Sequence, residues 1–234
     1  IEVFGPVLTQ TYGQAEACMI CTFFSPRDHV EALETNKRHR LASCGRISPL
    51  MRLEVMDDAG RIMPRGERGE IVVRGGLVMS GYYNNPQATA EASAFGWHHT
   101  GDIGVIDEDG FVYIVDRKKD MIISGGFNVY PQMIEQAIYT HPSVQEVIVI
   151  GIPDDYRGEA SKAFITLRAG AEPFTIEDLR AFLAGKLGKH ELPVAVEFLK
   201  ELPRTSVGKL SRHELRNQQR QNTQQPKLAT GGRS

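Results

Sequence analysis

The chain has 234 residues, 41% of them hydrophobic, which is enough to bury the core of one large or two small domains, and we expect two. Its 27 basic and 29 acidic side chains give a net charge of −2, which excludes the strongly positive surface of a nucleic-acid-binding protein. No apolar run approaches the roughly 20 residues of a membrane-spanning helix, and no signal peptide opens the chain, so we expect a cytoplasmic protein.

The start of the chain, the cysteines and a histidine pair bear on the origin of the chain and on possible metal sites. The chain starts at Ile1 without a methionine, as if cut from a longer protein. Cys18 and Cys21 stand at C-x-x-C spacing, but no second such element completes a zinc site, so the three cysteines are expected to be reduced thiols. His98 and His99 are adjacent on an expected strand and point to opposite faces, which makes them a poor metal-binding pair.

Residues 45–116 predict a small antiparallel barrel or curved sheet. They contain short β-favouring runs separated by turns rich in glycine and aspartate. The clearest runs are Leu53–Val55, Glu70–Arg74 and Phe111–Val115. Between the second and third runs, Asn85 and Pro86 precede a short predicted helix that spans residues 87–94.

After Arg117 the pattern changes to alternating helices and strands, which predicts a second, compact domain. Helices are expected after Tyr130-Pro131, over 176–187 behind a Thr175 cap, and over 211–220; strands are expected over 147–152, 163–167 and 194–198. The fold class is therefore α+β with two domains, residues 1–117 and 118–220. The tail, residues 221–234, is rich in Gln, Thr and Gly and is expected to be disordered.

The most informative stretch is residues 98–128. Asp102, in a Thr-Gly-Asp turn, could bind a vicinal diol, and Arg117 could reinforce the same ribose. Gly125 and Gly126 let the backbone approach a ligand where any Cβ would intrude. Together these residues imply a nucleotide ligand. Taken singly, Thr-Gly-Asp could be a common turn, residues 117–120 a solvated run of charges and Gly125-Gly126 a flexible turn.

This stretch resembles the adenylate-forming superfamily of acyl-CoA synthetases, luciferases and peptide-synthetase adenylation domains. The resemblance implies that Asp102 and Arg117 hold the ribose of AMP. It makes Lys119 the hinge about which a small C-terminal domain swings between an adenylating and a thioester-forming pose. It also places Gly125 and Gly126 at the pantetheine tunnel, where the second glycine leaves room for CoA.

Residues Tyr12-Gly13-Gln14-Ala15-Glu16 resemble a nucleotide-binding segment of the same superfamily. The resemblance implies that Tyr12 and Gly13 contact the adenine side of the nucleotide and that Glu16 serves the Mg²⁺ that accompanies ATP. Ala15 departs from the usual Thr or Ser, whose hydroxyl reaches the phosphate. We expect either a backbone amide to compensate or phosphate binding to be weaker.

Two later segments complete the resemblance. Residues 68–76 and 79–84 resemble a Gly-Glu-strand-Gly segment and its Gly-Tyr turn, and Glu70 is expected to stabilise the barrel. Residues 203–210 resemble the terminal Pro-x-T-x-x-Gly-Lys loop, which implies that Lys209 bridges the carboxylate substrate and the α-phosphate during adenylation. The resemblance implies that residues 1–117 are the C-terminal part of a large adenylation domain.

The resemblance implies an AMP-forming ligase that activates a carboxylic acid with ATP and transfers the acyl group to CoA. The segment from Asp116 to Gly126 looks most like medium- and long-chain fatty acyl-CoA synthetases, so a fatty acid is the expected substrate. No Ser/Thr/Gly-rich phosphate loop ending in Pro-Lys is present, so the chain alone is expected to be inactive. Exposed apolar surface on a truncated first domain favours a homo-oligomer.

Two alternatives stay open at this point. One is an adenylation domain or acyl-AMP ligase that loads a carrier protein; the short path from Lys119 to Gly125 and the absence of a carrier domain after Gln225 favour CoA instead. The other is a non-catalytic fragment that binds a nucleotide or CoA, or acts as an interaction module. Phosphate-loop sequence in a longer parent protein would separate the two classes.

Overall fold

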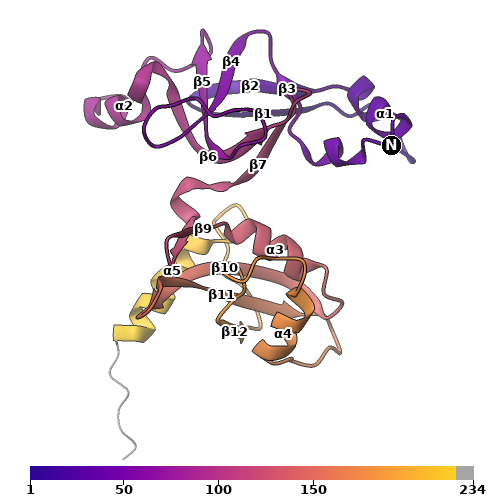
Figure 1. The fold of residues 1–234 in the computed structure, drawn as a ribbon, viewed down its shortest axis with the longest axis vertical. Coiled ribbons are helices and arrows are strands. Elements are labelled where there is room, and N and C mark those ends of the chain that lie inside the picture. Colours follow the sequence, from indigo (N-terminus) through magenta and orange to yellow (C-terminus); the bar gives the residue numbers. More distant parts are fainter. Residues whose placement is uncertain (225–234) are drawn as a thin grey trace, which may run out of the picture. The chain divides into compact units, whose positions relative to one another are not determined.

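A computed structural model describes residues 1–224 of the chain. It contains two compact units, Ile1–Lys119 (unit 1) and a second that begins at Asp120 (unit 2) (Figure 1). Both units combine helices with mostly antiparallel sheets, so the predicted α+β class is confirmed. Among these residues no helix combines the length and apolar character that crossing a membrane requires.

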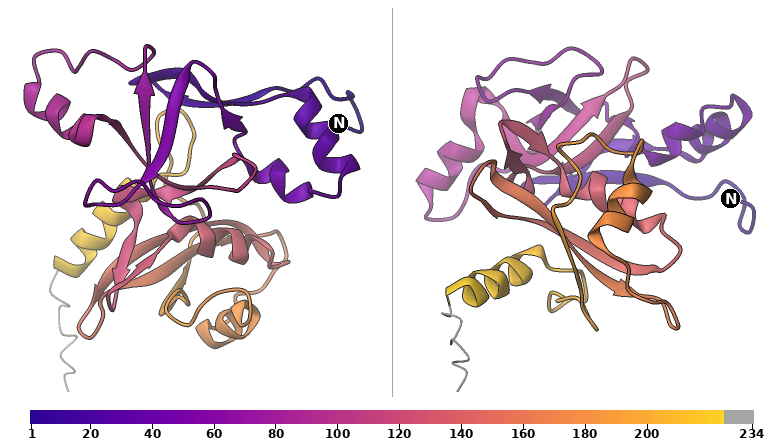
Figure 2. Two further views of the ribbon diagram at one scale, coloured as in Figure 1. Left: turned by 45° about the horizontal axis from the view of Figure 1, so that its top comes forward. Right: turned by 60° about the horizontal axis from the view of Figure 1, so that its bottom comes forward.

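Unit 1 is built from two antiparallel sheets. Its elements in chain order are β1 (Gln10–Gln14), β2 (Ala17–Phe24), α1 (Pro26–Glu34), η1 (Arg38–Ala42), β3 (Arg46–Ile47), β4 (Met51–Met56), β5 (Gly69–Gly75), α2 (Pro86–Ala92), η2 (Ala94–Gly96), β6 (His98–Ile106) and β7 (Val112–Arg117). The strand orders are β1-β2-β3 and β4-β5-β6-β7. Figure 2 shows α1 and α2 at opposite ends of this unit.

The four-stranded sheet is open. Among the described strands, β4 pairs only with β5 and β7 only with β6, so the sheet does not close into the barrel that one reading of residues 45–116 predicted. Both sheets contribute to one core instead. Its buried members include Cys21 of β2, Val55 of β4, Ile71 of β5 and Val112 of β7. The β1-β2-β3 sheet therefore covers one face of the four-stranded sheet.

Helix α1 begins with a capping box that the sequence interpretation did not use. The Ser25 side chain accepts a hydrogen bond from the Asp28 backbone, and the Asp28 side chain accepts one from the Ser25 backbone. Pro26 occupies the first turn, where its missing N–H costs nothing. The helix was therefore readable from a Ser-Pro-x-Asp pattern.

Unit 2 has one sheet with helices on both faces. Its elements are β8 (Ile122–Ser124), β9 (Phe127–Val129), α3 (Pro131–Tyr139), β10 (Val144–Asp154), β11 (Gly158–Leu167), α4 (Ile176–Leu183), β12 (Ala195–Phe198) and α5 (Arg212–Gln224); a short turn, η3 (Lys118–Asp120), precedes them. The strand order is β10-β11-β8-β9, and β12 pairs in parallel with β11.

Alternation along β10 explains the two-sided core of unit 2. Val147 and Val149 pack with α3 and α4 on one face, while Ile148 and Ile150 pack with Leu215 of α5 on the other. Successive side chains of a strand point to opposite faces, so a continuous apolar run is required when both faces are covered. The run from residue 147 to 152 predicted this strand for that reason.

The bounds of three helices differ from the predicted ones. Helix α2 spans Pro86–Ala92 rather than residues 87–94. Helix α4 starts behind the Thr175 cap as predicted but ends at Leu183 rather than at residue 187, because Ala184 is extended and Gly185 has a φ of +79°. Helix α5 continues to Gln224, past its predicted end at residue 220. The remainder of the predicted tail, residues 225–234, lies outside the described residues.

The three cysteines are free thiols. Cys21 and Cys44 are buried, and Cys18 is exposed. Burial raises the pKa of both buried thiols to about 11, because an apolar environment disfavours the thiolate. Neither buried thiol is thus prepared to act as a nucleophile near neutral pH.

Candidate functional site

A β-bulge in β6 presents Asp102. Strands β5 and β6 pair at Glu70 with Ile103 and at Val72 with His99. Between these pairs β5 has one residue, Ile71, whereas β6 has three, Thr100, Gly101 and Asp102. Gly101 takes a φ of +71°, a conformation that L side chains rarely adopt. A bulge of this kind re-aims side chains, and it explains why a Thr-Gly-Asp turn can lie inside a strand.

The bulge is held by its own threonine. The Thr100 hydroxyl donates to the carbonyl of Ile71 at 2.7 Å, and the backbone N–H of Asp102 donates to the same hydroxyl oxygen at 3.1 Å. Thr100 is itself buried, with 6% of its surface exposed. The backbone next to Asp102 is therefore held by hydrogen bonds within unit 1.

Both oxygens of the Asp102 carboxylate have partners. Arg117, opposite Asp102 on β7, contacts Oδ1 through Nε at 2.6 Å, and the Tyr12 hydroxyl donates to Oδ2 at 2.6 Å. The Asp102 residue is 4% exposed, whereas the Arg117 side chain is 52% exposed. The structure thus brings together three of the residues predicted to bind the nucleotide, from strands β1, β6 and β7.

Tyr12 stays a hydrogen-bond donor across the physiological pH range. Burial raises the pKa of its phenol, and the hydrogen bond to the Asp102 carboxylate raises that pKa further. The neighbouring Gly13 has a structural role in this strand, because a Cβ there would lie 2.8 Å from the backbone of Met19. The close approach of β1 and β2 at this point requires a glycine.

Glu16 lies at the tight turn between β1 and β2. The Tyr82 hydroxyl donates to its carboxylate at 3.0 Å, and the backbone carbonyl of Glu16 accepts from Met79 at 2.7 Å. The carboxylate is half-buried and keeps acceptor capacity beyond the single bond from Tyr82. Ala15, beside it, is exposed.

The two adjacent histidines point to different partners. Nε2 of His98 lies 3.0 Å from the Gln14 amide, and Nδ1 of His98 is buried with no partner among the described residues. Burial lowers the pKa of His98. His99 instead places its Nδ1 2.9 Å from the carboxylate of Glu70.

The end of unit 1 carries the predicted hinge residue. Lys119 is exposed and lies in the turn η3. Its neighbour Lys118 is bound on both sides, to Asp58 at 2.6 Å and to Glu70 at 3.0 Å. Lys118 is therefore held within unit 1 by two ion pairs, and the next residue, Lys119, is exposed.

In unit 2, Gly125 and Gly126 form the two-residue turn between β8 and β9. Both have positive φ, +59° and +84°, as a tight hairpin with mirror-image turn geometry requires. A Cβ at either position would meet nothing within 4 Å, so the backbone of the turn is open to an approaching group. Phe127 follows the turn and stacks on the His190 ring at 4.6 Å.

The loop that carries Lys209 is a small hairpin. The Thr205 amide donates to the Lys209 carbonyl at 2.7 Å, and the Gly208 amide donates to the Thr205 carbonyl at 2.8 Å. The Lys209 amide donates to the Thr205 hydroxyl at 3.2 Å. Gly208 turns the chain with a φ of +82°. Lys209 is exposed at the end of this hairpin.

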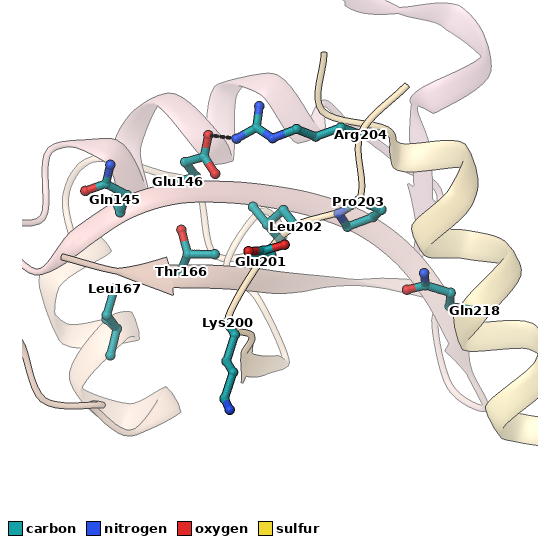
Figure 3. Close-up of a pocket in the computed structure, with 10 residues that line it drawn as sticks. All are labelled: Gln145, Glu146, Thr166, Leu167, Lys200, Glu201, Leu202, Pro203, Arg204 and Gln218. Carbon is teal, nitrogen blue, oxygen red and sulfur yellow. Dashed lines mark hydrogen bonds and ion pairs between the residues drawn. The ribbon is translucent and has the colours of Figure 1, made fainter. Parts of the chain in front are cut away.

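Arg204 braces the Lys209 hairpin against the sheet. Its Nη1 donates to the Gly208 carbonyl at 3.0 Å, and its Nη2 pairs with the Glu146 carboxylate on β10. Both residues line a groove of about 650 Å³. Figure 3 shows the side chain of Lys200, which lines the same groove, pointing away from the Arg204–Glu146 pair. The hairpin is thus attached to β10 through one planar guanidinium.

Sequence reasoning missed two kinds of contact. Glu70 was expected only to stabilise a barrel, but it bonds to His99, Gly101 and Lys118. Arg204 was not assigned a role. Neither partner set could be read from local patterns, because Glu70 and Lys118 are 48 residues apart and Arg204 and Glu146 are 58 residues apart.

Two family profiles match the chain. The profile described as AMP-binding enzyme matches residues 1–83, and the profile described as AMP-binding enzyme C-terminal domain matches residues 133–209. The first match contains Tyr12 and Glu16 and the second contains Lys209. Asp102 and Arg117 lie between the two matched segments.

Similar proteins agree with these matches. The chain is 42% identical over 221 residues to the long-chain-fatty-acid–CoA ligase of Bacillus subtilis, covering 94% of this chain and 38% of that protein. The solved structure of the amide bond synthetase McbA from Marinactinospora thermotolerans is 38% identical, with a TM-score of 0.80 over 93% of this chain and 43% of that one.

A third similar protein is o-succinylbenzoate coenzyme A synthetase from Bacillus subtilis, solved in complex with ATP and magnesium ion. It is 33% identical, with a TM-score of 0.75 over 89% of this chain and 41% of that one. The chain thus spans about two fifths of the length of the relatives that it matches. On the two profile matches and these relatives, the chain belongs to the AMP-binding enzyme family, whose members include acyl-CoA ligases.

Proposed function

We propose that this chain provides the ribose-binding part and the mobile C-terminal domain of an AMP-forming ligase that joins a fatty acid to CoA. The observation that carries the proposal is the Asp102 carboxylate on the β6 bulge, paired at 2.6 Å with the exposed guanidinium of Arg117. A carboxylate with an adjacent cation suits a vicinal diol close to a phosphate, because the carboxylate accepts from the hydroxyls and the cation attracts the anion.

The reaction proposed has two steps. The substrate carboxylate attacks the α-phosphate of ATP and releases pyrophosphate, which leaves an acyl-AMP; the thiol of CoA then attacks the acyl carbon and AMP leaves. Asp102 and Arg117 hold the ribose, and Tyr12 and Gly13 line the adenine side. Lys209 offsets the negative charge that builds on the α-phosphate, which contributes roughly 10²-fold in rate by analogy with single oxyanion donors.

The remaining predicted residues have supporting roles in this proposal. Glu16 would hold Mg²⁺, which binds one or two carboxylates together with substrate phosphates, and the ion would neutralise phosphate charge. A single half-buried carboxylate with spare acceptor capacity fits that requirement. The open turn at Gly125 and Gly126 leaves space for the pantetheine arm of CoA, and the exposed Lys119 serves as the hinge.

A fatty acid is the proposed substrate because the relative at 42% identity is named a long-chain-fatty-acid–CoA ligase. The o-succinylbenzoate synthetase, at 33% identity, is named for a different acid, so the acid has to be tested directly. We also propose that the protein is cytoplasmic and that it self-associates. Self-association is supported by exposed apolar side chains on unit 1, including Phe4, Met19 and Phe23.

A chimera tests the proposed reaction. The matching 221 residues of the Bacillus subtilis ligase are replaced by the corresponding residues of this chain, and ATP–pyrophosphate exchange is measured with palmitate, octanoate and benzoate. We expect exchange with the fatty acids, reduced about 10²-fold by Lys209→Ala. Lys200→Ala, which removes another lysine of unit 2, is the control. Exchange that survives Lys209→Ala undiminished would remove Lys209 from the reaction.

A further inference from the structure

Glu70 is a buried carboxylate that gathers donors from three places in unit 1. Oε1 accepts from the backbone N–H of Gly101 at 3.0 Å. Oε2 lies 2.9 Å from Nδ1 of His99 and accepts from Nζ of Lys118 at 3.0 Å. Its side chain is only 7% exposed. A sheet residue that served only to fill a core would have no need for a charged group with this set of partners.

One end of this arrangement is the bulge that carries Asp102. At the bulge the regular pairing of β5 with β6 is interrupted, and the Gly101 amide donates to the Glu70 side chain. Glu70 lies on β5, next to the residue that faces the bulge. Asp102 follows Gly101 directly. A shift of the Glu70 carboxylate would therefore move the peptide that sets the position of the Asp102 side chain.

The other end is the exit from unit 1. The Lys118 ammonium group bridges Glu70 and Asp58. Burial alone would lower its pKa, but the hydrogen bonds that it donates to these two carboxylates outweigh burial and raise the pKa. Lys118 immediately precedes Lys119, the last residue of unit 1. The Glu70 carboxylate is thus shared between the Asp102 bulge and the segment that leads into unit 2.

We propose that Glu70 is a positioning residue that links the Asp102 bulge to Lys118, so that ribose binding at one end and the conformation of the exit segment at the other depend on the same carboxylate. The link itself is a property of unit 1; its meaning for catalysis rests on the proposed role of Asp102 in holding ribose. By thermodynamic coupling, a change at Lys118 that alters the carboxylate should alter nucleotide affinity, although Lys118 pairs with Asp58 and Glu70 and it is Arg117 that pairs with Asp102.

Amide hydrogen exchange in the 234-residue chain tests the link without any ligand. Lys118→Met removes the cation, and we expect exchange at the Gly101 amide to accelerate about tenfold, as for weakening of a hydrogen bond to a charged group. Lys118→Arg, which keeps a donor within reach of Glu70, should restore the slow rate. Arg61→Met, which removes an exposed cation that pairs with Asp57, is the control and should leave Gly101 unchanged.

Glu70→Gln provides a second readout. The charge-assisted bond should give the Gly101 amide proton a downfield NMR shift that this variant loses, and adding Lys118→Met to it should have no further effect, because both changes act through one carboxylate. An unchanged Gly101 exchange rate in Lys118→Met would overturn the proposal. So would equal effects of Lys118→Met and Arg61→Met.

AMP titration separates this proposal from the proposed function. If Asp102 holds ribose, Lys118→Met should weaken AMP binding several-fold while Arg61→Met does not. If the wild-type chain binds no AMP, the ribose-binding role fails, but the exchange rates at Gly101 still decide whether Glu70 connects the two ends. AMP affinity that is identical in wild type and Lys118→Met would contradict the link to nucleotide binding.

Discussion

The Tyr12 hydroxyl donates a 2.6 Å hydrogen bond to Oδ2 of Asp102, across 90 residues of sequence. Tyr12 therefore occupies one oxygen of the carboxylate that is proposed to accept from ribose. Because Arg117 contacts the other oxygen and the residue is 4% exposed, the ribose hydroxyls of the proposed complex would compete with the phenol for the same carboxylate.

Tyr12→Phe should strengthen AMP binding. The ring remains and the competing hydroxyl is lost, so we expect about threefold to tenfold higher affinity by calorimetry, the size of one net hydrogen bond. Tyr113→Phe, which removes a similar Tyr–Asp bond to Asp107, is the matched control and should have no effect. Weaker binding in Tyr12→Phe would mean that the hydroxyl contacts the nucleotide itself.

Arg204→Met should slow adenylation without touching Lys209. Loss of the guanidinium removes its hydrogen bond to the Gly208 carbonyl within the hairpin and its ion pair with Glu146 on β10. The hairpin is then no longer attached to β10 through Arg204, so Lys209 occupies the required position less often. We expect ATP–pyrophosphate exchange in the chimera to fall about tenfold, less than for Lys209→Ala. Lys200→Met, from the same groove, should keep full exchange; equal losses in both variants would dismiss the brace.

The Glu70 network should contribute stability that depends on pH in one direction. Burial would raise the pKa of Glu70, but hydrogen bonds from His99 and Lys118 outweigh burial and hold the pKa below its ordinary value of 4.5. A carboxyl with a lowered folded-state pKa stabilises the fold fully above its unfolded-state pKa, and this contribution is lost as the pH falls through the folded-state pKa.

Urea unfolding of unit 1, followed by the fluorescence of Trp97, measures this dependence. The stability difference between wild type and Glu70→Gln should stay constant from about pH 7 to pH 5 and shrink at lower pH. Trp97 is the only tryptophan of the chain, so the signal reports on unit 1. A difference that grows as the pH falls would contradict the assigned pKa direction.

Local signals predicted local structure well. The Thr175 cap and the Gly125-Gly126 turn are properties of neighbouring residues, and both were confirmed. The end of α4 was misplaced, because the apolar spacing continues to Leu187 after the backbone has left the helix at Ala184. Apolar periodicity does not mark where a helix stops.

Contacts between distant strands could not be predicted in the same way. Thr100-Gly101-Asp102 was read as a turn, and only the pairing of β5 with β6 makes it a bulge inside a strand. The hydrogen bond from Tyr12 to Asp102 likewise depends on two sheets meeting in one core. Resemblance to a family pointed to these residues, but it did not supply the hydrogen bonds that position them.

Nucleotide discrimination by the 234-residue chain tests the ribose-binding claim most directly. AMP and 2′-deoxy-AMP differ only in one of the hydroxyls that Asp102 is proposed to accept from. We predict that the wild-type chain binds AMP about tenfold or more tightly than 2′-deoxy-AMP, and that Asp102→Asn removes most of this preference, because a charge-assisted hydrogen bond is lost. Equal affinities for the two nucleotides in the wild-type chain would contradict the account.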